Sequence, residues 1–233
     1  MLTHSPRIIT DGLVLCLDAA NRQSYPGSGT VWTDLAGSNN GTLTNGPTFN
    51  SANAGSIVFD GSNDRVALES SLDLRNLVTP LTITSWAFQN TTATRCIFAQ
   101  YTSTSNHRLV KMLRVDTSTL IYYYGINTGS FSWVTLSSPT VELNRWNFFS
   151  VTVSGTPTNA VIKVGLNLNY SQPVTRTNLT TTPDTSVSIN VGSNSAGSEL
   201  WHGRIANTLM YNRALSDAEL LQNYNATKGR YNL

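Results

Sequence analysis

The strongest constraint on the fold of this chain is a series of about a dozen short apolar runs with turn residues between them. Many runs alternate with period two: in residues 81–88, Leu81 and Ile83 fall on one face of an extended chain, and Thr82 and Thr84 fall on the other. The pattern predicts an all-β fold built as an antiparallel sandwich. The expected strands span residues 12–18, 56–60, 65–68, 81–88, 95–100, 108–115, 119–124, 130–136, 145–153, 160–168, 186–192 and 201–211.

A second signal predicts one short helix at the end of the chain. Ser216 can accept a hydrogen bond from the amide of Glu219, and the Glu219 carboxylate can reach back to the amide of Ser216, which together form a capping box. Leu215 and Leu220 have the spacing of a hydrophobic staple around that box. Leu220, Leu221 and Tyr224 then give one apolar helix face. A strand-rich chain is therefore expected to close on a single helix.

The length and net charge of the chain limit which domain organisation and which partners we expect. A sandwich of 233 residues commonly folds as one domain, so we expect a single domain over residues 11–233 and a short N-terminal arm over residues 1–10. The net charge of +2 gives no electrostatic reason to expect nucleic acid as a partner. The sequence predicts neither a signal peptide nor a membrane span, because it has no charged–apolar–small leader and no sufficiently long apolar run.

The surface is expected to be polar but weakly charged. Charged residues make up 12% of the chain, and Ser, Thr and Asn are abundant instead. Such a surface suits tight packing in an assembly, because few ions would lose their water. It equally suits an ordinary extracellular type of β protein, and both interpretations stay open.

The two cysteines, Cys16 and Cys96, both lie in apolar, strand-like runs. Two buried free thiols fit that placement, since free cysteine behaves as a small hydrophobic residue. One long-range disulfide also fits it.

Motifs along the chain resemble one family. These are residues 12–21 (GLVLCLDAAN), 24–37 (SYPGSGTVWTDLAG), 40–45 (NGTLTN) and 58–66 (VFDGSNDRV), the strands at 82–86 and 146–153, and the strand–helix close. Together they are similar to the laminin G-like, concanavalin A-like domains of structural proteins from tailed bacteriophages of the cyanophage type. The resemblance covers almost the whole chain and implies a jelly-roll sandwich. It implies little about activity, because this fold carries lectins, glycosidases, receptors and assembly modules.

Two acidic loops have a structural and a functional interpretation. Asp34 is expected to bond nearby amides in a turn. Asp60, Asn63 and Asp64 are expected to close a hairpin connection in the same way. They are also hard oxygen ligands at short spacing, so a calcium ion is the alternative, although the run lacks the loop pattern of an EF-hand. No other cofactor is expected.

Aromatic residues supply the candidate ligand site. Alternation places Tyr122 and Tyr124 on one face of a strand and Tyr123 on the other. An exposed Tyr122–Tyr124 pair beside Trp133 could stack on a sugar ring or on a partner protein. The remaining prominent aromatic residues are expected in the core: Trp86, Trp146, Phe148 and Phe149.

The sequence offers no catalytic set. Glycosidases need two carboxylates on either side of the scissile bond. Glu69, Glu142 and Glu199 have no acidic partner two or four positions on within an expected strand, and Glu219 belongs to the helix cap. The three histidines, at positions 4, 107 and 202, are isolated from any metal or nucleophile motif. We therefore expect a protein without enzymatic activity.

Two functional hypotheses follow. In the first, the chain is a virion structural protein on the outer surface of a phage, either a head decoration or cement subunit or a tail-associated subunit. It would contact other capsid or tail proteins through the arm and the sheet edges, self-associate as a homo-oligomer, and assist attachment to host-surface glycans. The alternative is a carbohydrate-binding module of a secreted protein or adhesin.

Overall fold

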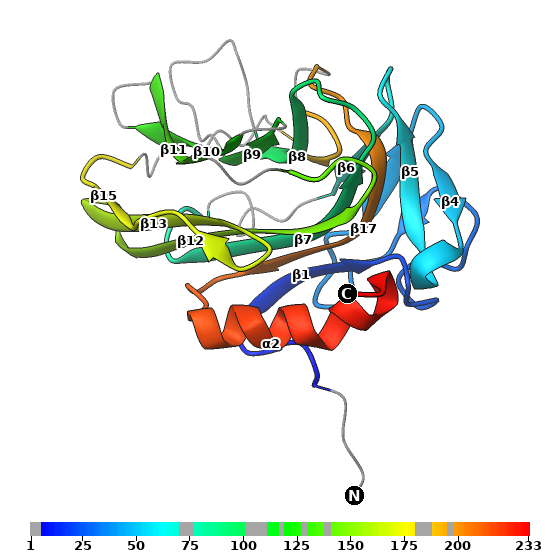
Figure 1. The fold of residues 1–233 in the computed structure, drawn as a ribbon, viewed down its shortest axis with the longest axis horizontal. Coiled ribbons are helices and arrows are strands. Elements are labelled where there is room, and N and C mark those ends of the chain that lie inside the picture. The colour runs from blue at the N-terminus through cyan, green and yellow to red at the C-terminus, as the bar shows by residue number, and fades with distance from the viewer. Residues whose placement is uncertain are drawn as a thin grey trace, which may run out of the picture.

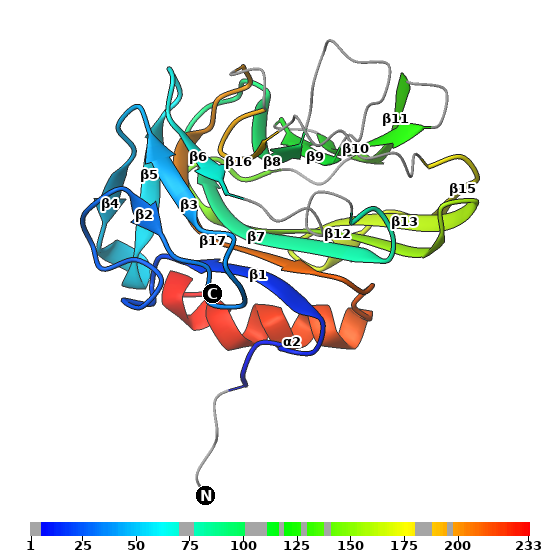
Figure 2. The ribbon, with the colours of Figure 1, turned by 180° about the vertical axis from the view of Figure 1, so that it is seen from behind.

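The computed structural model describes residues 6–69, 77–100, 111–116, 119–126, 130–137, 141–179, 188–194 and 198–233. Two antiparallel sheets lie face to face, and a helix, α2 (Asp217–Thr227), covers the outer face of one of them (Figures 1 and 2). This confirms the predicted all-β antiparallel sandwich with one short C-terminal helix. No helix within the described residues is long and apolar enough to cross a membrane.

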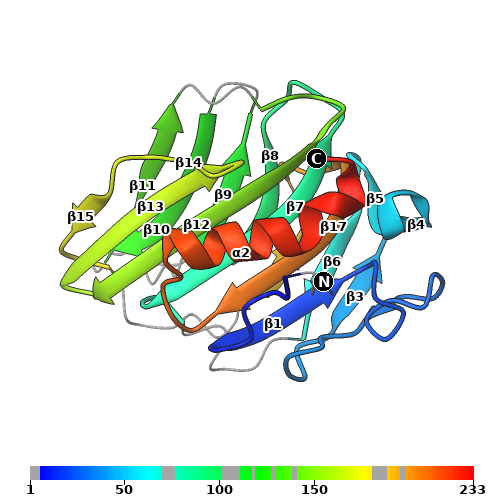
Figure 3. The ribbon, with the colours of Figure 1, turned by 60° about the horizontal axis from the view of Figure 1, so that its bottom comes forward.

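The sheet beneath α2, here called the helix-side sheet, has nine strands. Their order in space is β14 (Asn169–Tyr170), β13 (Asn159–Leu166), β12 (Trp146–Thr156), β7 (Leu81–Gln89), β17 (His202–Tyr211), β5 (Ser56–Asp60) and β4 (Thr48–Asn50), with β1 (Leu13–Asp18) also paired to β17 and β15 (Val174–Arg176) also paired to β13. The long central pair, β7 and β17, passes beneath α2 (Figure 3).

The opposite sheet has eight strands. Their order is β11 (Ser130–Ser137), β10 (Thr119–Ile126), β9 (Lys111–Val115), β8 (Arg95–Gln100), β16 (Ile189–Val191), β6 (Arg65–Leu68), β3 (Gly41–Thr44) and β2 (Val31–Trp32). Short one-turn helices, η1 (Ala52–Ala54) and η2 (Lys228–Tyr231), complete the described elements.

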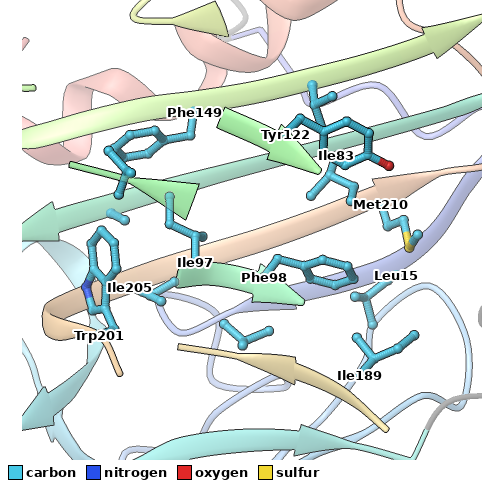
Figure 4. Close-up of a cluster of buried hydrophobic side chains, with 14 of the residues drawn as sticks. Leu15, Ile83, Ile97, Phe98, Tyr122, Phe149, Ile189, Trp201, Ile205 and Met210 are labelled. Atoms are coloured by element: carbon cyan, nitrogen blue, oxygen red, sulfur yellow. The ribbon is translucent and has the colours of Figure 1, made fainter. Parts of the chain in front are cut away.

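The hydrophobic core fills the space between the two sheets (Figure 4). In β7, Leu81 and Ile83 point into this core, as their alternation predicts. Thr82 is also fully buried, because the segment that leads into α2 covers the other face of the strand: the Thr82 hydroxyl accepts a hydrogen bond from the Leu215 amide at 2.9 Å. The central strands are therefore buried on both faces.

The prediction that Trp86, Trp146, Phe148 and Phe149 are buried is confirmed, since each is at most 7% exposed. Only Phe149 belongs to the core between the sheets. The other three form a separate aromatic cluster on the outer face of the helix-side sheet, which also contains Tyr231. This cluster attaches α2 and η2 to the sheet.

Both cysteines are free and buried. The sequence allowed either two buried free thiols or one disulfide, and the structure has two free thiols. Burial raises the pKa of Cys16 to about 12, helped by the nearby Asp18 and Asp34 carboxylates, so this thiol stays protonated at neutral pH.

The described part of the N-terminal arm contacts the chain's own helix. The Ile9 amide donates to Asn223 Oδ1 at 2.8 Å, and Gln222 Nε2 donates to the Arg7 carbonyl at 2.8 Å. The Tyr211 hydroxyl also donates to the Ile9 carbonyl, at 3.0 Å. Residues 7–9 therefore make hydrogen bonds within the chain. Contact of the arm with a neighbouring subunit stays a prediction.

The helix begins with the predicted capping box. Ser216 Oγ accepts from the Glu219 amide at 3.3 Å, and Glu219 Oε2 accepts from the Ser216 amide at 2.8 Å. Arg213 donates two further hydrogen bonds to the Glu219 carboxylate, at 2.7 and 3.0 Å. These contacts, with Arg213 first, lower the pKa of Glu219 from 4.5 to about 2.

Glu219→Gln is expected to lower the free energy of unfolding by about 1 kcal/mol near neutral pH, because it removes the charge from the cap and from the Arg213 pair. A carboxylate whose pKa is lower in the folded state stabilises the fold above its ordinary pKa. That stabilisation is lost as the pH falls from about 4.5 to about 2. Urea unfolding of both proteins across this range should show the difference shrinking. An equal gap at every pH would contradict the role given to the Glu219 charge.

Candidate functional site

The aromatic site predicted on β10 and β11 is only partly as expected. Alternation holds, but Tyr122 and Tyr124 are each 2% exposed and face the core between the sheets. Trp133 is 52% exposed, and its cross-strand neighbour is Tyr123, with ring centroids 6.0 Å apart. The expected exposure of the Tyr122–Tyr124 pair is therefore wrong. The two rings that alternation places together fill the core, and the outer face carries Tyr123 and Trp133.

The acidic loops form the predicted turns. Asp34 Oδ1 accepts from the Cys16 amide at 2.8 Å and from the Ala36 amide at 2.9 Å. Asp60 Oδ1 accepts from the Ser62 amide at 2.8 Å, and Asp64 Oδ2 accepts from the Asp60 amide at 3.0 Å.

These turn hydrogen bonds bear on the calcium hypothesis for Asp60, Asn63 and Asp64. The Ser62 amide lowers the pKa of Asp60, whereas burial raises that of Asp64. Among the described residues, no group of three or more His, Cys, Asp or Glu side chains is placed to hold a metal ion. Calcium binding at this loop stays a prediction.

A surface pocket of about 420 Å³ opens on the helix-side sheet, where β5, β7 and β17 lie side by side. We call it the rim pocket. Figure 3 shows these strands beside the C-terminal end of α2. The polar lining of the rim pocket consists of Asn50, Asp60, Asn90, Asn144, His202 and Arg204.

Strand register brings these residues together. His202 pairs with Asp60 of β5, and Arg204 pairs with Phe88 of β7. His202 and Arg204 are two residues apart on β17 and so share one face of the sheet. Asn90 follows the end of β7, and Asn144 precedes the start of β12. Because these strands pair antiparallel, with Trp146 opposite Phe88, both asparagines lie at the same edge of the sheet and line the same pocket.

The backbone at Gly203 allows the close approach of β7 and β17. Its φ of 142° is one that other residues rarely adopt. A Cβ at this position would lie 2.0 Å from the Phe88 carbonyl oxygen and 2.8 Å from Asn90 Oδ1. Glycine at this position therefore permits the local geometry of the rim pocket.

Arg204 is the main electrostatic feature of the rim pocket. Its guanidinium carbon lies 3.9 Å from the Phe88 ring centroid and 5.2 Å from that of Trp146, which are cation–π distances. The side chain is half-buried, and desolvation lowers its pKa, although arginine stays charged. The exposed Asp60 carboxylate carries the opposite charge in the same lining.

Sequence reasoning named Asp60 as a calcium candidate and noted His202 as isolated, but it did not bring them together. Asn50, Asn90, Asn144 and Arg204 were not predicted as site residues. One signal was present: in the predicted strand 201–211, the polar His202 and Arg204 alternate with Gly203 and Ile205, which places both on one face.

Comparison with known proteins identifies the family. Residues 60–221 match the profile of the Concanavalin A-like lectin/glucanases superfamily, a laminin G type of domain. The chain belongs to this family. The match confirms the predicted fold. No curated protein sequence matched the chain.

Solved structures with this fold include receptor-binding domains of botulinum neurotoxins. The domain of the C/D mosaic serotype superposes with a TM-score of 0.66 at 13% identity, over 95% of this chain and 52% of that one. The serotype D binding domain gives 0.67 at 12% identity, over 95% and 52%. The serotype DC domain in complex with rat synaptotagmin II gives 0.65 at 12%, over 93% and 52%. The chain thus spans about half the length of these neighbours, and the likeness is one of fold.

Proposed function

We propose that this chain is a non-catalytic binding domain that holds carbohydrate in the rim pocket. One observation carries the proposal: Asn90, Asn144, His202 and Arg204 converge on the pocket, and none of their side chains makes a hydrogen bond to another described residue. Amide groups both donate and accept, as sugar hydroxyls do. The neighbouring Phe88 ring adds an apolar wall to the pocket, and such a mixed lining is typical of small-ligand sites.

The same lining argues against hydrolysis. Hydrolysis of a glycosidic bond needs a pair of carboxyl groups about 5 to 9.5 Å apart. Among the lining residues, all of which the structure describes, Asp60 is the only carboxylate. One of its oxygens accepts from turn amides. A domain with this pocket is suited to hold a glycan without cleaving it.

The double variant Asn90→Ala/His202→Ala is expected to weaken glycan binding by about tenfold or more, because it removes two hydrogen-bonding side chains. Both side chains are exposed, so the fold should be retained. The measurement is an oligosaccharide array with the intact chain, followed by titration calorimetry on the best ligand.

Two controls separate this pocket from other surfaces. Asn169→Ala removes an exposed amide on β14 and should leave binding unchanged. Trp133→Ala removes the exposed ring on the opposite sheet and should also leave it unchanged. If Trp133→Ala abolished binding while the double variant did not, the Tyr123–Trp133 pair would be the sugar site instead. If no glycan bound, the proposed function would be wrong.

We also propose a biological setting, which rests on the resemblance to tailed-phage structural domains. The chain would be displayed on the outer surface of a virion, bound to capsid or tail proteins, with the rim pocket available to host-surface glycans. Exposed sheet edges, such as those of β11 and β2, could pair with virion partners or with a second copy of the chain. The receptor-binding neighbours make a surface-attachment role compatible with this fold.

Immunogold electron microscopy of purified phage particles tests this setting. Label over the heads would make the protein a decoration or cement subunit, and label at the tail would make it tail-associated. Particles without label would contradict the virion setting. The carbohydrate-binding module of a secreted protein or adhesin would then be the remaining hypothesis.

A further inference from the structure

Arg204 is a half-buried arginine that lines the rim pocket without a carboxylate partner among the described residues. Among the partly buried arginines of the described chain, Arg213 and Arg230 are paired with carboxylates at 2.7 to 2.9 Å, whereas Arg65, Arg95 and Arg176 have no such pair. Arg204 has no ion pair and no hydrogen bond to another described residue. Its contacts are the faces of Phe88 and Trp146.

Two neighbouring aromatic rings contact the guanidinium group of Arg204. The Phe88 and Trp146 rings meet edge to face, with centroids 5.5 Å apart and an interplanar angle of 65°. No described residue accepts a hydrogen bond from the Arg204 N–H groups, so these donors remain available to a ligand in the rim pocket. The guanidinium is a planar fork of donors that matches the two oxygens of a carboxylate, which it can bind through two parallel hydrogen bonds.

The charges of the rim pocket are separated along the strand. His202 and Arg204 are two residues apart on β17, which puts their Cα atoms about 6 to 7 Å apart. Asp60 pairs with His202, so the negative charge lies at the end away from Arg204. Turn amides already solvate one Asp60 oxygen. The pocket thus has a cationic end at Arg204. At its other end, the Asp60 carboxylate can accept hydrogen bonds from the hydroxyl groups of a ligand.

We propose that the rim pocket selects sugars that carry a carboxylate, such as uronic or sialic acids, and that Arg204 binds this carboxylate. The inference rests on the proposed function and specifies its ligand class. Asn90 and Asn144 would contact the hydroxyls of the same sugar. This polar amide lining favours a sugar over an acidic side chain of a protein, which offers no hydroxyls around its carboxylate.

Matched ligand pairs that differ in charge test the proposal. Titration calorimetry would compare sialyllactose with lactose, and an oligogalacturonide with its methyl ester. At least one acidic ligand should bind about tenfold more tightly than its neutral counterpart, because charge-assisted hydrogen bonds are stronger than neutral ones. Added salt should reduce that preference.

Two Arg204 variants and one control complete the experiment. Arg204→Gln should abolish the preference for the acidic ligand, so that the acidic and neutral ligands bind this variant with equal affinity. Arg204→Lys keeps the charge but not the fork, so it should retain only part of the preference. Arg22→Gln, at an exposed arginine outside the rim pocket, should change nothing. Thermal unfolding checks that each variant is folded.

The outcomes separate this inference from the proposed function. Equal binding of acidic and neutral ligands, insensitive to Arg204→Gln, would overturn the acidic-sugar inference and leave carbohydrate binding intact. Binding of neither class would overturn the proposed function itself. If a glutamate-rich peptide bound as tightly as the acidic sugar and lost affinity in Arg204→Gln, the ligand would be a protein carboxylate and the sugar assignment would be wrong.

Discussion

Replacing Trp86 with alanine is expected to lower the free energy of unfolding by about 3 to 5 kcal/mol, the usual cost of removing a buried aromatic side chain. Trp86 is fully buried, and its ring lies 5.3 Å from that of Phe148, 5.2 Å from that of Tyr224 and 4.4 Å from that of Tyr231. Its indole nitrogen donates to Thr227 Oγ1 at 2.8 Å. One side chain therefore holds the C-terminal helix and the turn after it on the sheet.

Thermal unfolding measures this effect. For a chain of this size, each kcal/mol moves the melting temperature by roughly 2 to 4 °C, so a decrease of about 6 to 20 °C is expected. Trp133→Ala is the matched control, because the same substitution at a half-exposed position should change stability by only about 0.5 kcal/mol. Equal losses from the two variants would contradict the anchoring role of Trp86.

Trp86 also shows where the sequence was informative and where it was not. The alternation of residues 81–88 placed Trp86 opposite Leu81 and Ile83 and predicted a strand. It could not show that the second face of the strand would also be buried, because that burial depends on a helix more than a hundred positions later. The capping box at Ser216 predicted the start of that helix from local chemistry alone, and its hydrogen bonds are present.

Local sequence patterns could not predict the shortest strands. Residues 21–50 contain β2, β3 and β4, which have two to four residues each. Runs of that length hold too few positions to show a period, so their conformation is set by the partners they pair with, such as β6 and β5. The same reason applies to β14 and β15.

The candidate site was predictable only in part, for a related reason. Alternation separated Tyr123 from its two neighbours correctly, but the sequence does not say which face of a strand meets the other sheet. The rim pocket joins β5, β7 and β17, and their register follows from the whole sandwich. Asp60 and His202 are cross-strand neighbours although 142 positions separate them, a contact that spacing along the chain cannot indicate.

Gly203→Ala is expected to lower the free energy of unfolding by about 2 to 6 kcal/mol and to damage the rim pocket. The φ of 142° would cost a residue with a Cβ about 1 to 3 kcal/mol. The added methyl group would also lie 2.0 Å from the Phe88 carbonyl oxygen, and relieving such overpacking costs a further 1 to 3 kcal/mol or so. The relief must separate β7 from β17 beneath Arg204, so glycan affinity should also fall.

Gly29→Ala separates the two causes. Gly29 also has a positive φ, 92°, but a Cβ there would meet nothing within 4 Å. It should therefore show the backbone cost alone and leave ligand binding unchanged. Urea unfolding gives the difference in stability between the two variants, and calorimetry at a temperature where both are folded gives the affinities. Equal losses of stability in Gly203→Ala and Gly29→Ala would show that the close approach of β7 to β17 is not the reason that position 203 needs glycine.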